Sequence, residues 1–158
     1  MINCNSSENL TYQEDGHYHL RVPAFFDYNS NANNIIDFIF DTGAFLTVIN
    51  RRTAVGLGFL HRFTVQTGIS LNGFSGSCLA DLKEIPGLII GGRRLEGVKV
   101  AVPHDDTDMS ILGLNVLEHF KYTIDTENDR IHFYTNPKPE IPDPLREAKI
   151  YTLAKNSD

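Results

Sequence analysis

The sequence lacks several features that mark specialised classes of protein. It has only two cysteines, Cys4 and Cys78, which form neither a disulfide framework nor a spaced zinc-binding pattern. No uninterrupted run of apolar residues exceeds three, whereas a transmembrane helix needs about 20 and the core of a signal peptide about 7–15. Asp and Glu (20) outnumber Lys and Arg (14), and the longest basic runs are pairs. We therefore expect no membrane span, no nucleic-acid partner and, by default, a cytoplasmic protein.

What remains is a composition suited to one folded domain. The chain has 158 residues, 41% of them apolar, and a single domain typically has roughly 150 residues. Residues 1–15 are polar and rich in Asn, Ser and Glu, which predicts a loose N-terminal arm. Four of the seven prolines fall within residues 137–158, which predicts a linker and tail. The folded domain is therefore expected over residues 16–136.

Short strand patterns separated by turn-forming residues fill this domain. Residues 18–24 alternate between two faces, and Pro23 favours an edge position for their strand. Residues 51–55 predict one helical turn, and residues 114–120, apolar at every third position, are the best helix candidate. The strand patterns cover 17–40 (as a hairpin), 46–49, 64–70, 78–82, 88–90, 95–102, 122–125 and 130–134. Many short strands with little helix predict a mainly β barrel or sandwich.

The motif most suggestive of chemistry begins where an apolar strand, residues 38–40, runs directly into Asp41-Thr42-Gly43-Ala44. An unpaired buried carboxylate costs several kcal/mol or shifts its pKa, so this placement of Asp41 favours a chemical role. The alternative is an aspartate that caps a β-turn through its own backbone. The tripeptide by itself is compatible with both readings.

Four features in the same order resemble the retroviral-type (retropepsin-like) aspartic proteases, over roughly residues 17–134. Asp41–Ala44 resembles the active-site loop of that family. Ile111, Leu112 and Gly113 resemble the apolar-apolar-Gly signature that threads beneath and supports this loop, and residues 114–120 resemble the helix that follows. The glycine-rich segment 71–78 lies where the family places its substrate-covering flap, with the tip at Asn72, Gly73, Phe74, Ser75 and Gly76. Beyond these four features, residues 122–125 and 130–133 also resemble the closing hairpin of the family.

The resemblance implies a fold and an activity. The fold would be a closed or partly open acid-protease β-barrel, a single lobe with one short C-terminal helix. The activity would be that of an aspartic endopeptidase, in which two carboxylates about 3 Å apart share one proton and activate a water without metal or cofactor. The sequence has no second Asp-Thr-Gly. The resemblance therefore implies a homodimer with one Asp41 from each chain, acting on a peptide or protein in extended conformation.

Each residue of the loop has an implied role in such a site. Asp41 would be the catalytic group, as base toward water and acid toward the carbonyl oxygen. Thr42 would hydrogen-bond across the dyad, and Gly43 would allow the backbone to come close. Ala44, together with Phe40 and Phe45, would help to keep water out.

Other interpretations of the sequence are weaker. Residues 104–108, His-Asp-Asp-Thr-Asp, offer metal-ligand types but no spaced second cluster, so a solvated loop is expected and no metal site. Ser75 and Ser77 do not form the Gly-x-Ser-x-Gly turn that a serine nucleophile needs. The alternative from another functional class is a non-catalytic peptide-binding or dimerisation module with the same fold.

Overall fold

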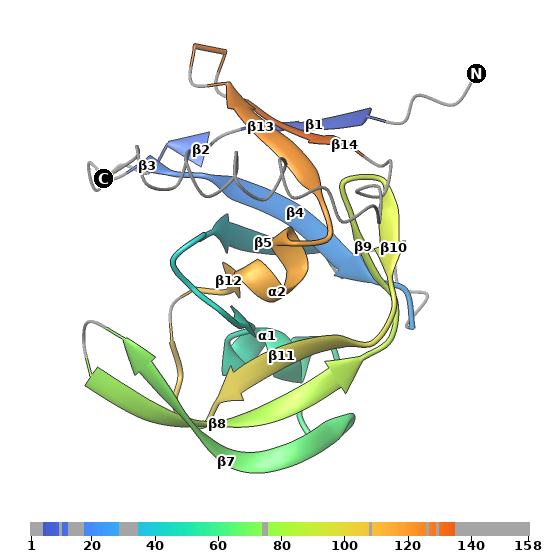
Figure 1. Cartoon of the computed structure of the whole chain (residues 1–158). Coiled ribbons are helices and arrows are strands. Elements are labelled where there is room, and N and C mark those ends of the chain that lie inside the picture. The colour runs from blue at the N-terminus through green and yellow to red at the C-terminus, as the bar shows by residue number, and fades with distance from the viewer. Residues whose placement is uncertain are drawn as a thin grey trace, which may run out of the picture.

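The computed structural model describes residues 5–9, 11–12, 18–28, 35–73, 76–107, 109–125, 127–128 and 130–134. Its elements, in chain order, are β1 (Asn5–Asn9), β2 (Thr11–Tyr12), β3 (Tyr18–His19), β4 (Arg21–Phe26), β5 (Ile35–Phe40), β6 (Thr47–Val48), α1 (Arg51–Gly56), β7 (Thr64–Gly73), β8 (Gly76–Ile85), β9 (Leu88–Ile90), β10 (Arg93–Leu95), β11 (Val98–Pro103), β12 (Ile111–Leu112), α2 (Leu114–Leu117), β13 (Lys121–Asp125) and β14 (Arg130–Tyr134). The mainly β fold expected from the strand patterns is confirmed (Figure 1).

The largest sheet has nine strands in the order β10-β9-β4-β5-β12-β6-β11-β8-β7, and it is open. A barrel closes only when its two end strands pair, and here β10 and β7 each pair with one neighbour alone. β7 and β8 instead extend to one side as a long hairpin (Figure 1), and most β7 side chains are exposed. Of the closed or partly open barrel that was expected, the closed form is therefore wrong for the described part of the chain.

Strand β4 lies inside this sheet, between β9 and β5. Val22, Ala24 and Phe26 are buried, which matches the predicted alternation. The edge position predicted from Pro23 is wrong for the strand as a whole. However, β9 pairs only with Phe25 and Phe26. The ladder on that side does not extend to Pro23, so the missing N–H of proline costs no ladder bond there.

The last hairpin, β13–β14, is confirmed, and it packs on the core of the large sheet through aromatic rings. Phe133 is fully buried and meets the Phe120 ring edge-on, with centroids 5.3 Å apart. Tyr122 meets the Phe40 ring in the same way at 5.1 Å. Phe40 immediately precedes Asp41, so these ring contacts help to fix the end of β5.

The β13–β14 hairpin belongs to a separate three-stranded sheet, in the order β1-β14-β13, and β1 of the N-terminal segment is its third strand. β1 pairs antiparallel with β14 along its whole length, from Asn5 opposite Tyr134 to Asn9 opposite Arg130. The loose arm expected over residues 1–15 is therefore corrected for this stretch. Backbone groups form the ladder, so a polar strand can pair wherever a neighbouring edge is open. The predicted linker and tail, residues 137–158, lies outside the described residues.

Two short helices, α1 and α2, are described. The resemblance implied one short helix, which is α2, and the sequence pattern also predicted a helical turn over residues 51–55, which α1 confirms. α1 begins at its cap Asn50, whose side-chain oxygen accepts a hydrogen bond from the Thr53 amide at 2.8 Å. α2 is shorter than the predicted 114–120. The amides of His119 and Phe120 bond to carbonyls three residues back rather than four, at Val116 and Leu117. This tighter turn brings Phe120 into the core.

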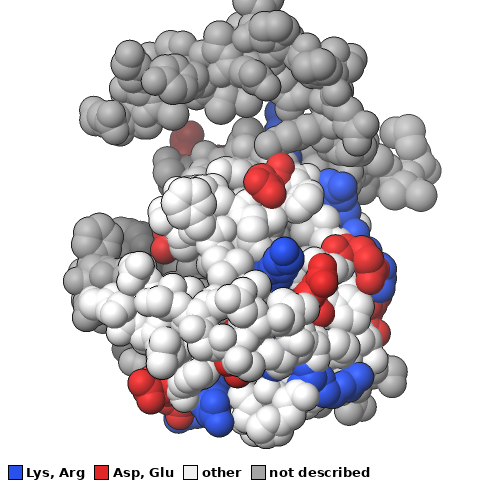
Figure 2. Space-filling view, turned by 60° about the horizontal axis from the view of Figure 1, so that its bottom comes forward, with Lys and Arg blue, Asp and Glu red and all other residues white. Residues whose placement is uncertain are grey.

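The surface carries acidic and basic side chains in mixture. On the face shown in Figure 2 the two signs are interspersed and separated by uncharged residues, so this face has no basic stripe of the kind that nucleic acid requires. Among the described residues, no helix has the length and apolar character needed to cross a membrane.

Candidate active site around Asp41

Asp41 stands at the end of β5, where the large sheet changes from antiparallel to parallel pairing. β5 pairs antiparallel with β4 and parallel with β12, in the register Phe40 opposite Leu112. The Asp41 amide continues this ladder by donating to the Leu112 carbonyl at 3.1 Å. The sheet therefore delivers a half-buried Asp41 directly into an exposed turn made by Thr42 and Gly43.

The carboxyl group of Asp41 is held by its own turn. Its Oδ1 accepts a hydrogen bond from the Gly43 amide at 2.8 Å, and the Ala44 amide donates to the Asp41 carbonyl at 3.3 Å. This is the turn-capping contact that the sequence left open as an alternative to catalysis. It engages Oδ1 alone, and Oδ2 has no hydrogen-bond partner within the described residues. Asp41 can therefore cap its own turn through Oδ1 and still offer Oδ2 for chemistry.

Gly43 leaves room for this arrangement. A Cβ at that position would stand 3.1 Å from Oδ1 of Asp41, closer than ordinary van der Waals contact. A Cβ there would require the carboxyl group to shift by a few tenths of an ångström. The glycine expected from the motif thus has a specific steric reason in the structure.

The segment Ile111–Gly113 lies against the loop, as the resemblance implied. A Cβ on Gly113 would come within 2.6 Å of the Leu46 carbonyl carbon, which shows how closely the two backbones approach. Beyond Gly113, the Leu114 amide donates to the Ala44 carbonyl at 2.8 Å. The loop is therefore bound to this segment on both sides of its exposed turn.

Two polar residues at this junction were missed by the sequence reasoning, Thr47 and Asn115. Thr47 is fully buried, and both its amide and its hydroxyl donate to Oδ1 of Asn115, at 2.8 and 2.9 Å. The two residues are 68 positions apart, and no local pattern links them. An Asn two residues after the apolar-apolar-Gly signature was the one available signal.

An apolar wall adjoins Asp41 on the same sheet. Ile111 pairs with Ile39 on one side and Val48 on the other, so the three side chains occupy one row across three strands. Ile39 is nearly buried, while Val48 and Ile111 are half-buried. Phe45 was expected to shield the site, yet its side chain is 86% exposed in the single chain. Shielding by Phe45 therefore does not occur within one chain.

The flap segment forms the expected hairpin. β7 and β8 pair up to Asn72 opposite Ser77 and Gly73 opposite Gly76. The tip residues Phe74 and Ser75 lie outside the described residues. The two strands run longer than the predicted 64–70 and 78–82, because they pair with each other almost to the turn and β8 also pairs with β11 as far as Ile85.

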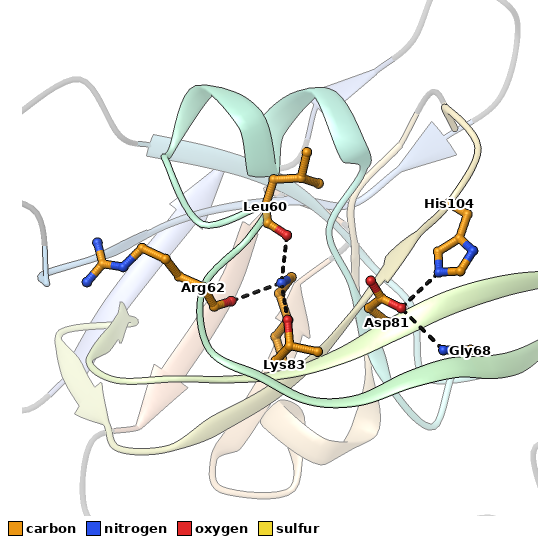
Figure 3. A network of polar contacts seen from close by, with 7 residues as sticks. Leu60, Arg62, Gly68, Asp81, Lys83 and His104 are labelled. Atoms are coloured by element: carbon orange, nitrogen blue, oxygen red, sulfur yellow. Dashed lines mark hydrogen bonds and ion pairs between the residues drawn. The ribbon is translucent and has the colours of Figure 1, made fainter.

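The base of this hairpin contains a buried lysine. Lys83 on β8 is 0% exposed, and its ammonium group donates to the Leu60 and Arg62 carbonyls, both at 2.9 Å, and to Oγ1 of Thr64 at 2.8 Å (Figure 3). Burial lowers the pKa of Lys83, and the charge of Asp81 opposes this effect. Three acceptors satisfy its three donors, so Lys83 fastens β8 to the segment that leads into β7.

Asp81 joins the same hairpin to the segment after β11. Its Oδ1 lies 2.8 Å from Nε2 of His104 and accepts a hydrogen bond from the Gly68 amide at 3.2 Å (Figure 3). His104 thus has a partner outside the acidic stretch 104–108. Within the described ranges, no three metal-ligating side chains are grouped closely enough to hold an ion.

The contact between Asp81 and His104 predicts a specific loss of stability in acid. The hydrogen bond from His104 is the largest cause that lowers the pKa of the Asp81 carboxyl group. Stability from a lowered carboxyl pKa is present above the unfolded value of about 3.9 and is lost as the pH falls through the folded value. Urea unfolding from pH 6 to pH 2 should therefore show a steeper acid loss in the wild type than in Asp81→Asn. Equal slopes in the two proteins would contradict this assignment, and His104→Ala should also flatten the loss.

Two clefts on the described surface do not have Asp41 in their lining. One, of about 440 Å³, is lined in part by Leu46, Lys99 and Asn115. A smaller one, of about 180 Å³, is lined in part by Asn50 and Met109. Neither includes Asp41, so these clefts do not mark the site of the carboxyl group.

Comparisons with known proteins agree with this geometry. A family model described as gag-polyprotein putative aspartyl protease matches residues 29–119. A retropepsin-like aspartic protease from Rickettsia conorii matches with a TM-score of 0.60 and 26% identity, over 80% of this chain and 98% of that one. The EIAV protease complexed with the inhibitor HBY-793 shares the fold, with a TM-score of 0.51 and 19% identity over 69% of this chain and 92% of that one. Comparison with curated protein sequences found no match. Because the family model spans more than half of its residues, the chain belongs to the retropepsin-like, gag-polyprotein aspartyl protease family.

Proposed function

We propose that this chain is an aspartic endopeptidase whose active site is shared by two identical chains. The observation that carries the proposal is the placement of Asp41: its carboxyl group stands at a sheet end, with one oxygen bound by the Gly43 amide and the other without a hydrogen-bond partner among the described residues. Membership of the aspartyl protease family supports the reaction class. The protease domain would comprise residues 16–136.

The chemistry requires a second carboxylate, which the chain does not supply from another Asp-Thr-Gly. Two Asp41 groups on a two-fold axis would share one proton, because like charges about 3 Å apart cannot both ionise. The shared pair takes a proton from water while it gives one to the carbonyl oxygen of the scissile bond. Thr42 and Gly43 are exposed, so the tip of the loop is accessible to a second chain, where Thr42 would hydrogen-bond across the dyad.

The substrate that fits this surface is an extended peptide with apolar side chains. The row formed by Ile39, Val48 and Ile111 provides an apolar wall beside Asp41. The β7–β8 hairpin would close over the peptide through its tip, Asn72–Gly76, where Gly73 and Gly76 permit backbone movement. The wild-type protein should cleave members of a peptide library, and pepstatin should block the cleavage. Peptide binding without cleavage would instead support a non-catalytic binding module.

Activity should depend on protein concentration, because each site needs two chains. Specific activity is expected to fall when the protein is diluted through its dimer dissociation constant. Sedimentation velocity measured over the same concentrations should show the dimer fraction falling in parallel. A monomer that retains full specific activity would rule out the two-chain site.

A further inference from the structure

We propose that Thr47 and Asn115 act together as positioning residues that set the placement of the Asp41 loop for catalysis. The proposal rests on the protease function proposed above and adds two residues to it. Neither side chain reaches the carboxyl group of Asp41, so both would act through the backbone that carries it.

The Thr47 hydroxyl is a buried junction between two segments. It accepts a hydrogen bond from the Gly113 amide at 3.0 Å and donates to Oδ1 of Asn115 at 2.9 Å. Thr47 is fully buried, with no water-accessible alternative for either bond. Loss of the hydroxyl would therefore leave a buried N–H of Gly113 without its acceptor.

Asn115 bonds to three parts of the chain through its side chain and its own amide. Its Oδ1 accepts from both the amide and the hydroxyl of Thr47, and its Nδ2 donates to the Lys99 carbonyl at 2.7 Å. Its own amide donates to the Phe45 carbonyl at 3.0 Å. Asn115 thus binds the chain on both sides of Leu46 and connects it to β11.

Backbone hydrogen bonds link the Thr47–Asn115 pair to the loop that carries Asp41. Phe45 lies four residues beyond Asp41, and the Ala44 carbonyl is held by the neighbouring Leu114 amide. Gly113 lies so close to the Leu46 backbone that an added Cβ would stand 2.6 Å from the Leu46 carbonyl carbon. A change in the Thr47–Asn115 pair would therefore move the loop itself, and small misplacements of a reacting group reduce turnover strongly.

The amide of Asn115 is specifically suited to this position. An aspartate would keep the acceptor for Thr47 but lose the donor to the Lys99 carbonyl. A leucine of similar size would lose both and leave the donors of Thr47 unsatisfied. The pair Asn115→Asp and Asn115→Leu therefore separates the contact with Thr47 from the contact with Lys99.

The test compares Thr47→Val, which removes the hydroxyl at equal size, with Thr47→Ser, which keeps it. In the full chain, Thr47→Val should lower kcat about 10- to 100-fold with KM within about twofold, whereas Thr47→Ser should stay within about threefold of wild type. Thr123→Val, at an exposed strand position, is the matched control and should have wild-type kinetics. Asn115→Leu should behave like Thr47→Val, and Asn115→Asp, which keeps the acceptor for Thr47 but loses the donor to the Lys99 carbonyl, should lose less turnover than Asn115→Leu.

Hydrogen–deuterium exchange supplies a readout that does not depend on activity. Amides of residues 41–47 should exchange at least about tenfold faster in Thr47→Val and Asn115→Leu, with 121–134 unchanged. Unchanged loop exchange in both variants, or equal impairment in Thr47→Ser and Thr47→Val, would overturn the proposal. If wild-type protein cleaves no peptide, the proposed function fails, and the exchange pattern still decides whether the pair positions the loop.

Discussion

Replacing Asp41 with asparagine is expected to abolish peptide hydrolysis while the protein stays folded. Asparagine keeps an oxygen for the hydrogen bond from the Gly43 amide, so the turn should be preserved. It cannot take a proton from water, and loss of a general base costs up to about 10,000-fold in rate. We expect kcat/KM to fall by at least about 1,000-fold. Steady-state kinetics on a peptide that the wild type cleaves, with circular dichroism as a folding check, measures both.

Asp37→Asn is the matched control for this experiment. Asp37 lies on β5, four residues before Asp41, and its exposed carboxyl group pairs with Arg21 at 2.8 Å on the surface. Exposed ion pairs contribute little to stability, so this variant should keep wild-type activity. An Asp41→Asn protein with activity within about tenfold of wild type would show that Asp41 is not the catalytic group.

Replacing Gly113 with alanine should destabilise the fold severely. The new Cβ would stand 2.6 Å from the Leu46 carbonyl carbon and 2.8 Å from both the Leu46 oxygen and the Thr47 nitrogen. These are backbone atoms, which cannot rotate away as the end of a flexible side chain can. Overpacking of this kind costs about 3 kcal/mol in the free energy of unfolding, a fall in Tm of about 10 °C. Urea and thermal unfolding of the purified variant measure the loss.

Gly56→Ala provides the comparison at a glycine with open surroundings. Gly56 ends α1, and a Cβ there meets no atom within 4 Å. Because alanine favours helix over glycine by up to about 1 kcal/mol, this variant should be neutral or slightly more stable. A Gly113→Ala protein as stable as Gly56→Ala would contradict the close approach that supports the loop.

The consequence for function follows from the same contact. Gly113 holds Leu46 and Thr47 in place, and these residues continue directly from the Asp41 loop. A Gly113→Ala protein that still folds at low temperature should therefore also lose turnover. The loss would have the same origin as that expected for Thr47→Val, a displaced loop rather than a missing catalytic group.

Much of the local structure could be predicted from the sequence, because its causes lie within a few residues. Alternation in residues 18–24 indicated β4, the turn residues at 72–76 placed the β7–β8 hairpin, and Asp41-Thr42-Gly43 marked the site. Asn50 at the start of α1 shows the same principle, since a cap and its amide are three residues apart. In each case the side chain and the backbone it organises are neighbours in the chain.

The remaining features depended on contacts between distant segments. Nothing near Lys83 in the sequence indicates that it is buried, because its acceptors lie 19 to 23 positions away. The polar strand β1 pairs with β14 more than 120 residues later, and Thr47 meets Asn115 across 68. The sequence by itself determined a mainly β domain and pointed to Asp41 as the candidate catalytic residue. The tertiary structure alone decided that the sheet stays open and which side chains hold the Asp41 loop, because those hydrogen bonds exist only once distant strands have paired.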